Sequence, residues 1–297
     1  MPRVNYIASE PAASIMVRRI LVTGANKGIG LAIVNRCMQD HSDTHVVMGC
    51  RSASRGDAAK AELVRSNPEW SDRLTVLQMD TGEDESVKAA ARHLTGMVGE
   101  KPPPLYAIVN NAGIASSNVA ETLNVNVRGP KRVDDAFLPL LDPSCGRIVQ
   151  MSSGAASGCV SRSSAEKQAL FTDQTITWAR ITSLMEEASA YTNGAADFEA
   201  NGIGTPMSAG AYGLSKALLN SYTICAAREH PKLKINSCSP GMIATDFIGN
   251  MLPWWVPVPN MLLRYLVKKM MNGERTFNPN PANAAVFTPH TLRACRP

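Results

Sequence analysis

Short apolar runs alternate with helical segments along most of this chain, and this alternation restricts the fold more than any other feature. Most runs lack a polar face, as strands do when both sides of their sheet are covered. Between them lie stretches whose apolar residues recur at helical spacing, such as GIGLAIVNRCMQD (28–40) and DESVKAAARHLTGMV (84–98). The expected strands are 19–24, 45–50, 74–79, 105–110, 147–152 and 234–239. Repeated strand–helix alternation predicts an α/β fold with a doubly wound parallel sheet, the Rossmann fold.

Composition and charge exclude several classes of protein. The 297 residues, 44% of them hydrophobic, suit one large α/β domain, which we expect to span residues 17–297. The net charge is +5, and its basic clusters, Arg18 with Arg19 and Lys268 with Lys269, are too short to indicate nucleic-acid binding. No apolar run approaches the roughly 18 residues that a membrane helix needs. This mild excess of positive charge would also suit a small anionic partner.

The cysteines indicate a reducing compartment. The chain has seven, an odd number, without the spacing of a metal site. Several lie inside apolar runs, where a reduced cysteine behaves as a small hydrophobic residue. Residues 1–16 are a poor secretory signal and a poor mitochondrial leader, and we expect them to form a disordered extension. We therefore expect a cytoplasmic protein without a metal.

Two regions interrupt the alternation. Residues 160–210 combine a helical patch, TWARITSLMEEASAY, with a loop of small residues, and predict a helical insertion. Residues 250–272 join a proline-rich loop to a methionine-rich amphipathic helix. This helix could be a lid over an apolar substrate, since methionine adapts to irregular surfaces. It could instead bind a membrane surface or a partner protein.

A glycine-rich turn, TGANKGIG (23–30), directly follows the first expected strand and opens a helix. Gly24, Gly28 and Gly30 have the G-x-x-x-G-x-G spacing. Glycine lets the backbone turn tightly and approach a pyrophosphate, whose charge then lies at the helix N-terminus. A purely structural turn is the alternative, but the strand before and the helix after it favour a dinucleotide site.

The end of the second expected strand indicates which dinucleotide is bound. Folds that prefer NAD place an acidic residue about 20 residues past the glycine turn, where it accepts hydrogen bonds from the ribose. Here Arg51 occupies that region, and Lys27 adds a positive charge within the turn. A 2′-phosphate needs cations, so the pair favours NADP(H). Without Lys27, a solvated arginine at a strand end would be the simpler interpretation.

Tyr212 and Lys216 lie four residues apart in GAYGLSKALLNSY (210–222), a stretch that we expect to be helical. Residues four apart share a helix face, so the phenol and the ammonium lie one turn from each other. An ordinary amphipathic surface is the alternative for this pair taken alone. The other motifs of the chain favour a chemical role.

Six motifs occur in an order that resembles the short-chain dehydrogenase/reductase family. They are TGANKGIG (23–30), NNAG (110–113), N-x-x-G (126–129), MSS (151–153), YGLSK (212–216) and SPGMIATD (239–246). Asn26 and Lys27 in the glycine turn resemble the carbonyl reductase branch. The resemblance spans residues 18 to about 250. It implies NADPH-dependent reduction of a ketone, aldehyde or quinone to an alcohol by hydride transfer.

The resemblance also implies catalytic roles. Tyr212 would be the general acid, and Lys216 would lower its pKa and bind the nicotinamide ribose. Ser153 would orient the carbonyl, with Ser152 as the competing assignment. Asn126 would hold a water that links Lys216 to solvent, although an asparagine that initiates a helix is the alternative.

For the cofactor, the resemblance implies a larger set of residues. Asp80 would meet the adenine amino group, and NNAG would line the adenosine side, with Asn110 also stabilising the sheet. Ile243 and Thr245 would bind the carboxamide. The expected cofactor residues are Gly24, Asn26, Lys27, Gly28, Ile29, Gly30, Arg51, Asp80, Asn110, Ala112, Gly113, Tyr212, Lys216, Pro240, Gly241, Ile243 and Thr245.

The chain also departs from the family's usual pattern. Ser153 and Tyr212 are 59 residues apart, and in the carbonyl reductase branch an insertion here covers the oligomer face and leaves a monomer. The family's substrate loop falls at about 247–275, which favours the lid. Asn126 follows Gly113 by only 13 positions, fewer than is usual, and the missing piece would belong to the loop beside the substrate cleft. The chain also stops where the family usually adds a last strand, so the sheet would lack its final edge strand and the pocket one wall. A binding-only sensor or scaffold is therefore the rival to an enzyme.

Overall fold

A computed structural model describes residues 17–99, 105–205 and 210–240. Six strands form one parallel sheet in the order β3-β2-β1-β4-β5-β6. They are β1 (Arg18–Thr23), β2 (Thr44–Cys50), β3 (Leu74–Gln78), β4 (Ala107–Asn110), β5 (Arg147–Met151) and β6 (Lys234–Cys238). The order reverses between β1 and β4, and doubly wound folds bind their ligands at such a point. The predicted fold class is confirmed.

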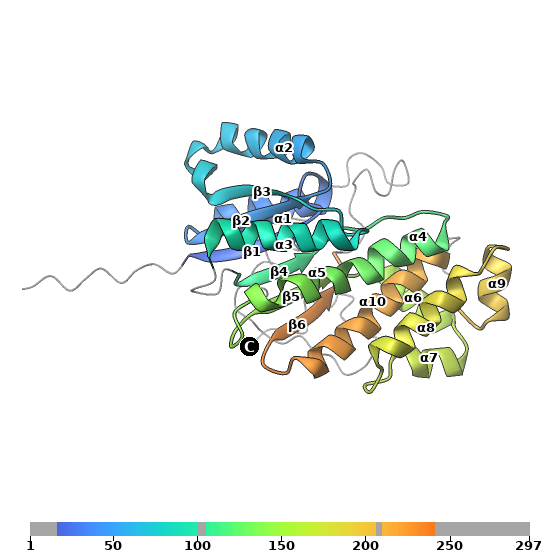
Figure 1. Ribbon diagram of the computed structural model, residues 1–297. Coiled ribbons are helices and arrows are strands. Elements are labelled where there is room, and N and C mark those ends of the chain that lie inside the picture. Colours follow the sequence, from blue (N-terminus) through green and yellow to red (C-terminus); the bar gives the residue numbers. More distant parts are fainter. Residues whose placement is uncertain (1–16, 100–104, 206–209, 241–297) are drawn as a thin grey trace, which may run out of the picture.

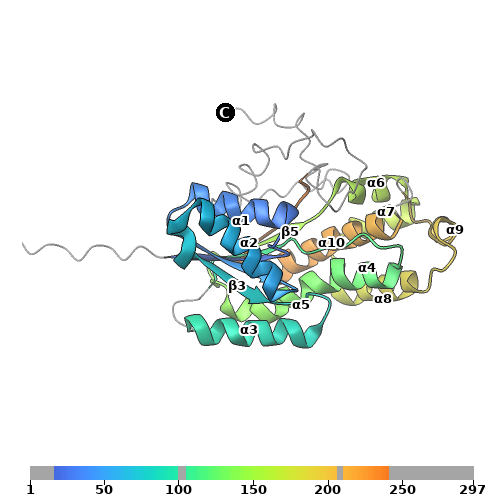
Figure 2. The same cartoon turned by 90° about the horizontal axis from the view of Figure 1, so that it is seen from above.

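Helices cover both faces of the sheet (Figures 1 and 2). The helical elements before the insertion are α1 (Gly28–Asp40), α2 (Ala53–Ser66), η1 (Pro68–Arg73), α3 (Asp84–Val98), α4 (Val119–Leu123), η2 (Asn124–Arg128), α5 (Gly129–Phe137) and η3 (Leu138–Leu140). Apolar residues of α1 and α2 pack on one face, and those of α3, α4 and α5 pack on the other. Figure 2 shows α1 and α3 on opposite sides of the strands.

The strands are apolar on both faces because each face has its own core. In β1, Leu21 packs into the core beneath α3 and α5, whereas its neighbours Ile20 and Val22 pack beneath α1. In β4, Ile108 and Val109 divide between the same two cores. Successive residues of a strand point to opposite faces, so a strand covered on both sides reads as a continuous apolar run.

The insertion is helical and belongs to the same domain. It follows α6 (Gly154–Arg162), comprises α7 (Ala165–Phe171), α8 (Trp178–Ser189) and α9 (Ala195–Ala200), and leads into α10 (Gly210–Glu229). Ile181 and Leu184 of α8 are buried in one core with Leu218 of α10. Hydrogen bonds close the base of the insertion. Ser164 N donates to Gly202 O over 2.8 Å, and Gly204 N donates to Ser163 Oγ over 2.9 Å.

Some expectations fall outside the described residues. These are the extension at 1–16, the substrate loop at about 247–275 and the choice between a lid and a surface helix at 250–272. Within residues 17–99, 105–205 and 210–240, no helix combines the length and hydropathy that crossing a membrane requires. The same residues contain no cluster of three or more metal-binding side chains.

Candidate active site

The glycine turn between β1 and α1 has the geometry that its sequence predicts. Gly24 and Gly28 have φ angles of 65° and 55°, in the left-handed region that favours glycine. A Cβ at Gly30 would lie 2.2 Å from Gly24 O, so only glycine fits there. Lys27 occupies the N-cap of α1, and no side-chain hydrogen bond caps the helix. The first N–H groups of α1 therefore suit an anion.

The loop after β4 is fastened to this turn by Asn111. Its Nδ2 donates to Thr23 O over 2.9 Å and to Gly24 O over 3.3 Å. Thr23 Oγ1 in turn accepts from the backbone N–H groups of Asn111 and Ala112, at 3.0 and 2.9 Å. Our sequence analysis included Asn111 only within NNAG and gave it no role of its own. The available signal was a pair of polar residues, Thr23 and Asn111, at the carboxyl ends of two strands that pair in the sheet.

The residues expected to bind the adenosine end lie at this same edge of the sheet. Ala25 N donates to Gly49 O over 3.2 Å, which ties the glycine turn to the end of β2. Arg51 directly follows β2 and is exposed, as is Lys27. Asp80 lies just beyond β3, where its Oδ1 accepts from Gly82 N over 2.9 Å. Lys27 and Arg51 are therefore both exposed to solvent near the glycine turn.

Ser153, Tyr212 and Lys216 come together at the carboxyl end of β5. Ser153 is the N-cap of α6, and its Oγ accepts from Ala155 N over 3.2 Å. Its side chain is also hydrogen-bonded to Tyr212. Ser152, the competing assignment, is buried, and its Oγ has no hydrogen-bond partner in the described structure. The geometry therefore favours Ser153.

Lys216 is a buried cation beside the tyrosine. It is 4% exposed, its Nζ donates to Met151 O over 2.8 Å, and Nζ lies 5.6 Å from the centroid of the Tyr212 ring. Burial lowers the pKa of Lys216 to about 8, because water no longer solvates the ammonium. A buried lysine held at a strand end in this way is unusual for a structural residue and typical of a functional one.

The expectation that Lys216 lowers the pKa of Tyr212 is wrong for this structure. Burial is the largest influence and raises the pKa of Tyr212, while the hydrogen bond with Ser153 opposes that rise. The ammonium of Lys216 is directed to Met151 O. In this arrangement the phenol of Tyr212 stays protonated at neutral pH.

Asn126 is fully buried in the π-helical turn η2, between α4 and α5. Its Oδ1 accepts from Ile114 N, and its Nδ2 donates to Ile114 O, both over 2.9 Å. Since α4 runs directly into η2, Asn126 does not initiate a helix. A Cβ at Gly113 would lie 3.2 Å from Asn126 Oδ1 and 3.6 Å from Lys216 Nζ. The absence of a side chain at Gly113 therefore lets Asn126 and Lys216 both lie close to this loop.

Asn110 lies at the end of β4 but belongs to a different cluster, centred on Asp134. Its Nδ2 donates to Asp134 Oδ1 over 2.7 Å. Asp134 Oδ2 accepts from Gln150 Nε2 over 2.7 Å and from the Tyr222 hydroxyl over 2.8 Å. Burial raises the pKa of Asp134 to about 7, against the effect of these three donors. Sequence analysis missed this cluster.

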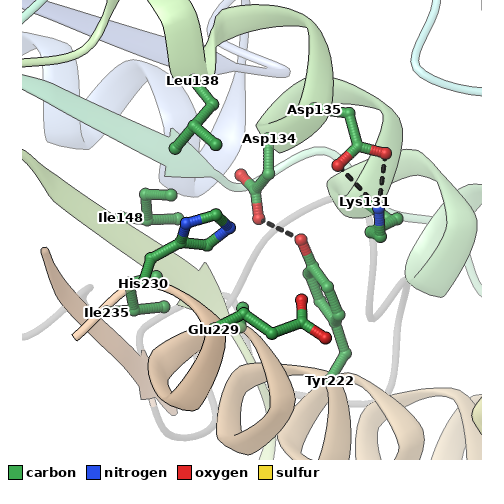
Figure 3. Close-up of a pocket in the computed structure, with 10 residues that line it drawn as sticks. Lys131, Asp134, Asp135, Leu138, Ile148, Tyr222, Glu229, His230 and Ile235 are labelled. Atoms are coloured by element: carbon green, nitrogen blue, oxygen red, sulfur yellow. Dashed lines mark hydrogen bonds and ion pairs between the residues drawn. The ribbon is translucent and has the colours of Figure 1, made fainter. Parts of the chain in front are cut away.

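A hollow beside Asp134 is too small for a substrate. It has about 20 Å³ of space, enough for an ordered water. Figure 3 shows Lys131, Asp135, Glu229 and His230 around it.

Of the other expected cofactor residues, Pro240 is the last described, and Gly241, Ile243 and Thr245 lie outside the described residues.

The fold and these residues define a class, the dinucleotide-binding α/β proteins with a serine, a tyrosine and a lysine at the carboxyl edge of the sheet. Residues 18–170 match the family model described as short chain dehydrogenase. Carbonyl reductase (NADPH) 1 from Homo sapiens is 32% identical over 245 residues, with 77% of this chain and 83% of the relative covered. Short-chain dehydrogenase/reductase 1 from Saponaria officinalis is 31% identical over 264 residues, with coverage of 77% and 82%. The chain belongs to the short-chain dehydrogenase/reductase family, in its carbonyl reductase-like branch.

Solved structures show the same fold. Salutaridine reductase from Papaver somniferum matches with a TM-score of 0.71 at 23% identity, covering 89% of this chain and 97% of that one. An NADPH-bound carbonyl reductase from chicken fatty liver matches with a TM-score of 0.58 at 24% identity, with coverage of 89% and 93%. As a member of this family, the chain is an oxidoreductase with a site for a nicotinamide cofactor.

Proposed function

We propose that the chain reduces a ketone, aldehyde or quinone with NADPH, and that Tyr212 is the general acid. The hydrogen bond between Ser153 and Tyr212, with the buried ammonium of Lys216 one helical turn away, is the observation that carries this proposal. Two hydroxyls that meet at the carboxyl edge of the sheet can both reach one carbonyl oxygen. The names of the carbonyl reductase relatives give independent support.

The glycine turn fits a dinucleotide. The space that a Cβ would fill at Gly30 and the uncapped N-terminus of α1 suit a pyrophosphate. The exposed cations Lys27 and Arg51 suit a 2′-phosphate, and Lys216 would bind the nicotinamide ribose. When bound, NADPH supplies the hydride.

The chain's own residues would then handle the substrate oxygen and its proton. Ser153 orients and polarises the carbonyl, and the Tyr212 hydroxyl donates a proton to the oxygen as negative charge develops on it. Burial, which raises the pKa of Tyr212, keeps that proton in place until it is needed. The hydrogen bond with Ser153, which opposes the rise in the pKa of Tyr212, stabilises the phenolate that remains. Asn126 holds a water through which the proton is replaced.

Substitution of Tyr212 tests the proposal. NADPH consumption is measured with the full chain against quinones, aromatic ketones, aldehydes and steroids. We expect Tyr212→Phe to lower turnover roughly 10²–10⁴-fold, the usual contribution of general acid catalysis, with NADPH affinity within a few-fold. Ser153→Ala should behave similarly, whereas Lys216→Met should also weaken NADPH binding.

Tyr222→Phe is the matched control, because it removes a hydroxyl from the same helix at Asp134, away from the reaction. It should lower stability and leave turnover near normal. Near-normal turnover in Tyr212→Phe would rule out the mechanism. Tight NADPH binding without turnover of any carbonyl would favour the rival function, a sensor or scaffold.

We also propose that the protein is a monomer in the cytoplasm. Helix α8 buries Ile181 and Leu184 against the core that includes α4 and α10, and Trp178 makes an edge-on contact with Tyr222 at 5.4 Å between ring centroids. This face is therefore covered by the chain itself. Sedimentation equilibrium should give about 31.9 kDa, the mass of one chain, and a dimer or tetramer would contradict the proposal. The six described cysteines are free thiols, which supports a reducing compartment.

A further inference from the structure

Ser215 lies between Tyr212 and Lys216 in sequence, and its side chain is completely buried. Its Oγ donates to Tyr212 O, the backbone carbonyl one turn earlier, over 2.8 Å. The same Oγ accepts from Asn126 Nδ2 over 3.0 Å, across 89 residues of sequence. The serine hydroxyl therefore joins the helix turn that holds Tyr212 to the expected proton-relay residue.

Both polar atoms of the Asn126 side chain have partners, and a second lone pair on Oδ1 is left for the relay water. Its Oδ1 accepts from Ile114 N, one Nδ2 hydrogen reaches Ile114 O, and the other reaches Ser215 Oγ. Three segments meet at this amide: the loop that begins at Gly113, the turn η2 and α10. The bonds to Ile114 fix the amide to the loop, and the bond to Ser215 joins it to α10. A buried network whose members are all hydrogen-bonded to one another favours one arrangement of those members.

We propose that Ser215 is a positioning residue that holds Asn126 in register with Tyr212 and Lys216. The proposal rests on the reductase function proposed above. Ser215 acts through Asn126, because its bond to Tyr212 O ties that amide to the helix turn that carries the tyrosine. A shift of the order of 1 Å in a reacting group can lower a rate about 100-fold without abolishing binding, so loss of this one hydroxyl should be visible in turnover.

Ser221 provides a matched control on the same helix. It is also completely buried, and its Oγ also bonds a backbone carbonyl one turn earlier, that of Ala217, at 3.2 Å. Its second partner is Phe171 O in the insertion, at 2.9 Å. Ser215→Ala and Ser221→Ala thus remove the same group from similar surroundings, but only the first touches Asn126.

The experiment compares Ser215→Ala, Ser221→Ala, Asn126→Ala and the double variant of Ser215 and Asn126. We expect both serine variants to lower the unfolding temperature by similar amounts. Ser215→Ala should lower kcat about 10–100-fold, with the KM for the carbonyl and the Kd for NADPH within about threefold. Ser221→Ala should keep kcat within about twofold. In the Asn126→Ala background, the serine change should alter kcat less than about twofold, because its effect passes through Asn126.

Ser215→Thr, which retains the hydroxyl, should recover most of the lost turnover. Normal kcat in Ser215→Ala, or an equal loss in the Asn126→Ala background, overturns the positioning role while leaving the proposed function in place. If the unmodified chain binds NADPH but reduces no carbonyl, the proposed function fails and the positioning role fails with it.

Discussion

Replacing Asp134 by asparagine should change how the stability of the protein depends on pH. Asp134 is buried, and burial raises its pKa to about 7, from a usual value of 3.8. Between about pH 4 and pH 7 the folded chain therefore keeps a proton that the unfolded chain has already released. This contribution to stability is complete below about pH 4 and is lost as the pH rises towards 7.

The cluster around Asp134 can accept either state of the carboxyl group. Three donors, from Asn110, Gln150 and Tyr222, stabilise the ionised form. Asn110 Oδ1 and Gln150 Oε1, the other ends of two of these groups, have no hydrogen-bond partner. Rotation of either amide by half a turn would present an oxygen to a protonated carboxyl. The proton therefore has an acceptor without any movement of the backbone.

The two pKa values set the size of the effect. The rise from 3.8 to about 7 corresponds to a loss on the order of 4 kcal/mol in the free energy of unfolding across the whole titration. The slope cannot exceed about 1.4 kcal/mol for each pH unit, so the change from pH 5 to pH 7 should be about 2–3 kcal/mol. Asparagine does not ionise, so at this position it makes no pH-dependent contribution to the free energy of unfolding.

Urea unfolding at several pH values from 5 to 8, followed by tryptophan fluorescence, measures this difference. The stability of Asp134→Asn relative to the unmodified chain should rise with pH by about 2–3 kcal/mol between pH 5 and pH 7. Asp135→Asn is the control, since Asp135 is 61% exposed in its side chain and pairs with Lys131 at the surface. Parallel curves for Asp134→Asn and the unmodified chain would refute the reasoning, because they would mean that Asp134 does not titrate in this range.

Two other predictions concern the cofactor turn. Arg51→Asp should reduce or reverse a preference for NADPH over NADH on the order of 100-fold, because each charged hydrogen bond to the 2′-phosphate contributes about 1.5–3 kcal/mol. Equal Kd values for the two cofactors in the unmodified chain would exclude this role for Arg51 and Lys27. Gly30→Ala should greatly weaken NADPH binding, since its Cβ would lie 2.2 Å from Gly24 O. Gly96→Ala, whose Cβ meets nothing within 4 Å, should instead raise stability by about 0.5–1 kcal/mol, and unchanged NADPH affinity in Gly30→Ala would contradict the structural argument.

The sequence predicts the sheet well because a strand that is buried on both faces is a continuous apolar run in the sequence. The apolar run at 19–24 corresponds to β1 at Arg18–Thr23, and the glycine turn follows as expected. Hydrophobic periodicity reports that a residue is buried, but it does not report which residue lies opposite. For this reason Asn111 and Asn110, adjacent in sequence, were indistinguishable, although one fastens the glycine turn and the other binds Asp134.

The site is predictable only in part for a related reason. Tyr212 and Lys216 share a helix face by spacing alone, but the direction of a pKa shift depends on burial and on atoms from distant segments. Gln150 lies on β5, and Tyr222 lies on α10, 88 residues from Asp134. No local pattern links them, and only the folded chain brings their polar groups to one carboxylate.

The closed base of the insertion makes it a structurally separable segment of the domain. Because Ser164 N meets Gly202 O and Gly204 N meets Ser163 Oγ, the chain leaves the Rossmann frame and returns to it at almost the same point. A segment with adjacent ends can be gained or lost as a unit, since joining those ends directly requires no shift of the strands around it and costs little loop entropy. The same geometry makes this position a natural place to graft a helical segment from another relative, with the buried face of α8 as the part that must be matched.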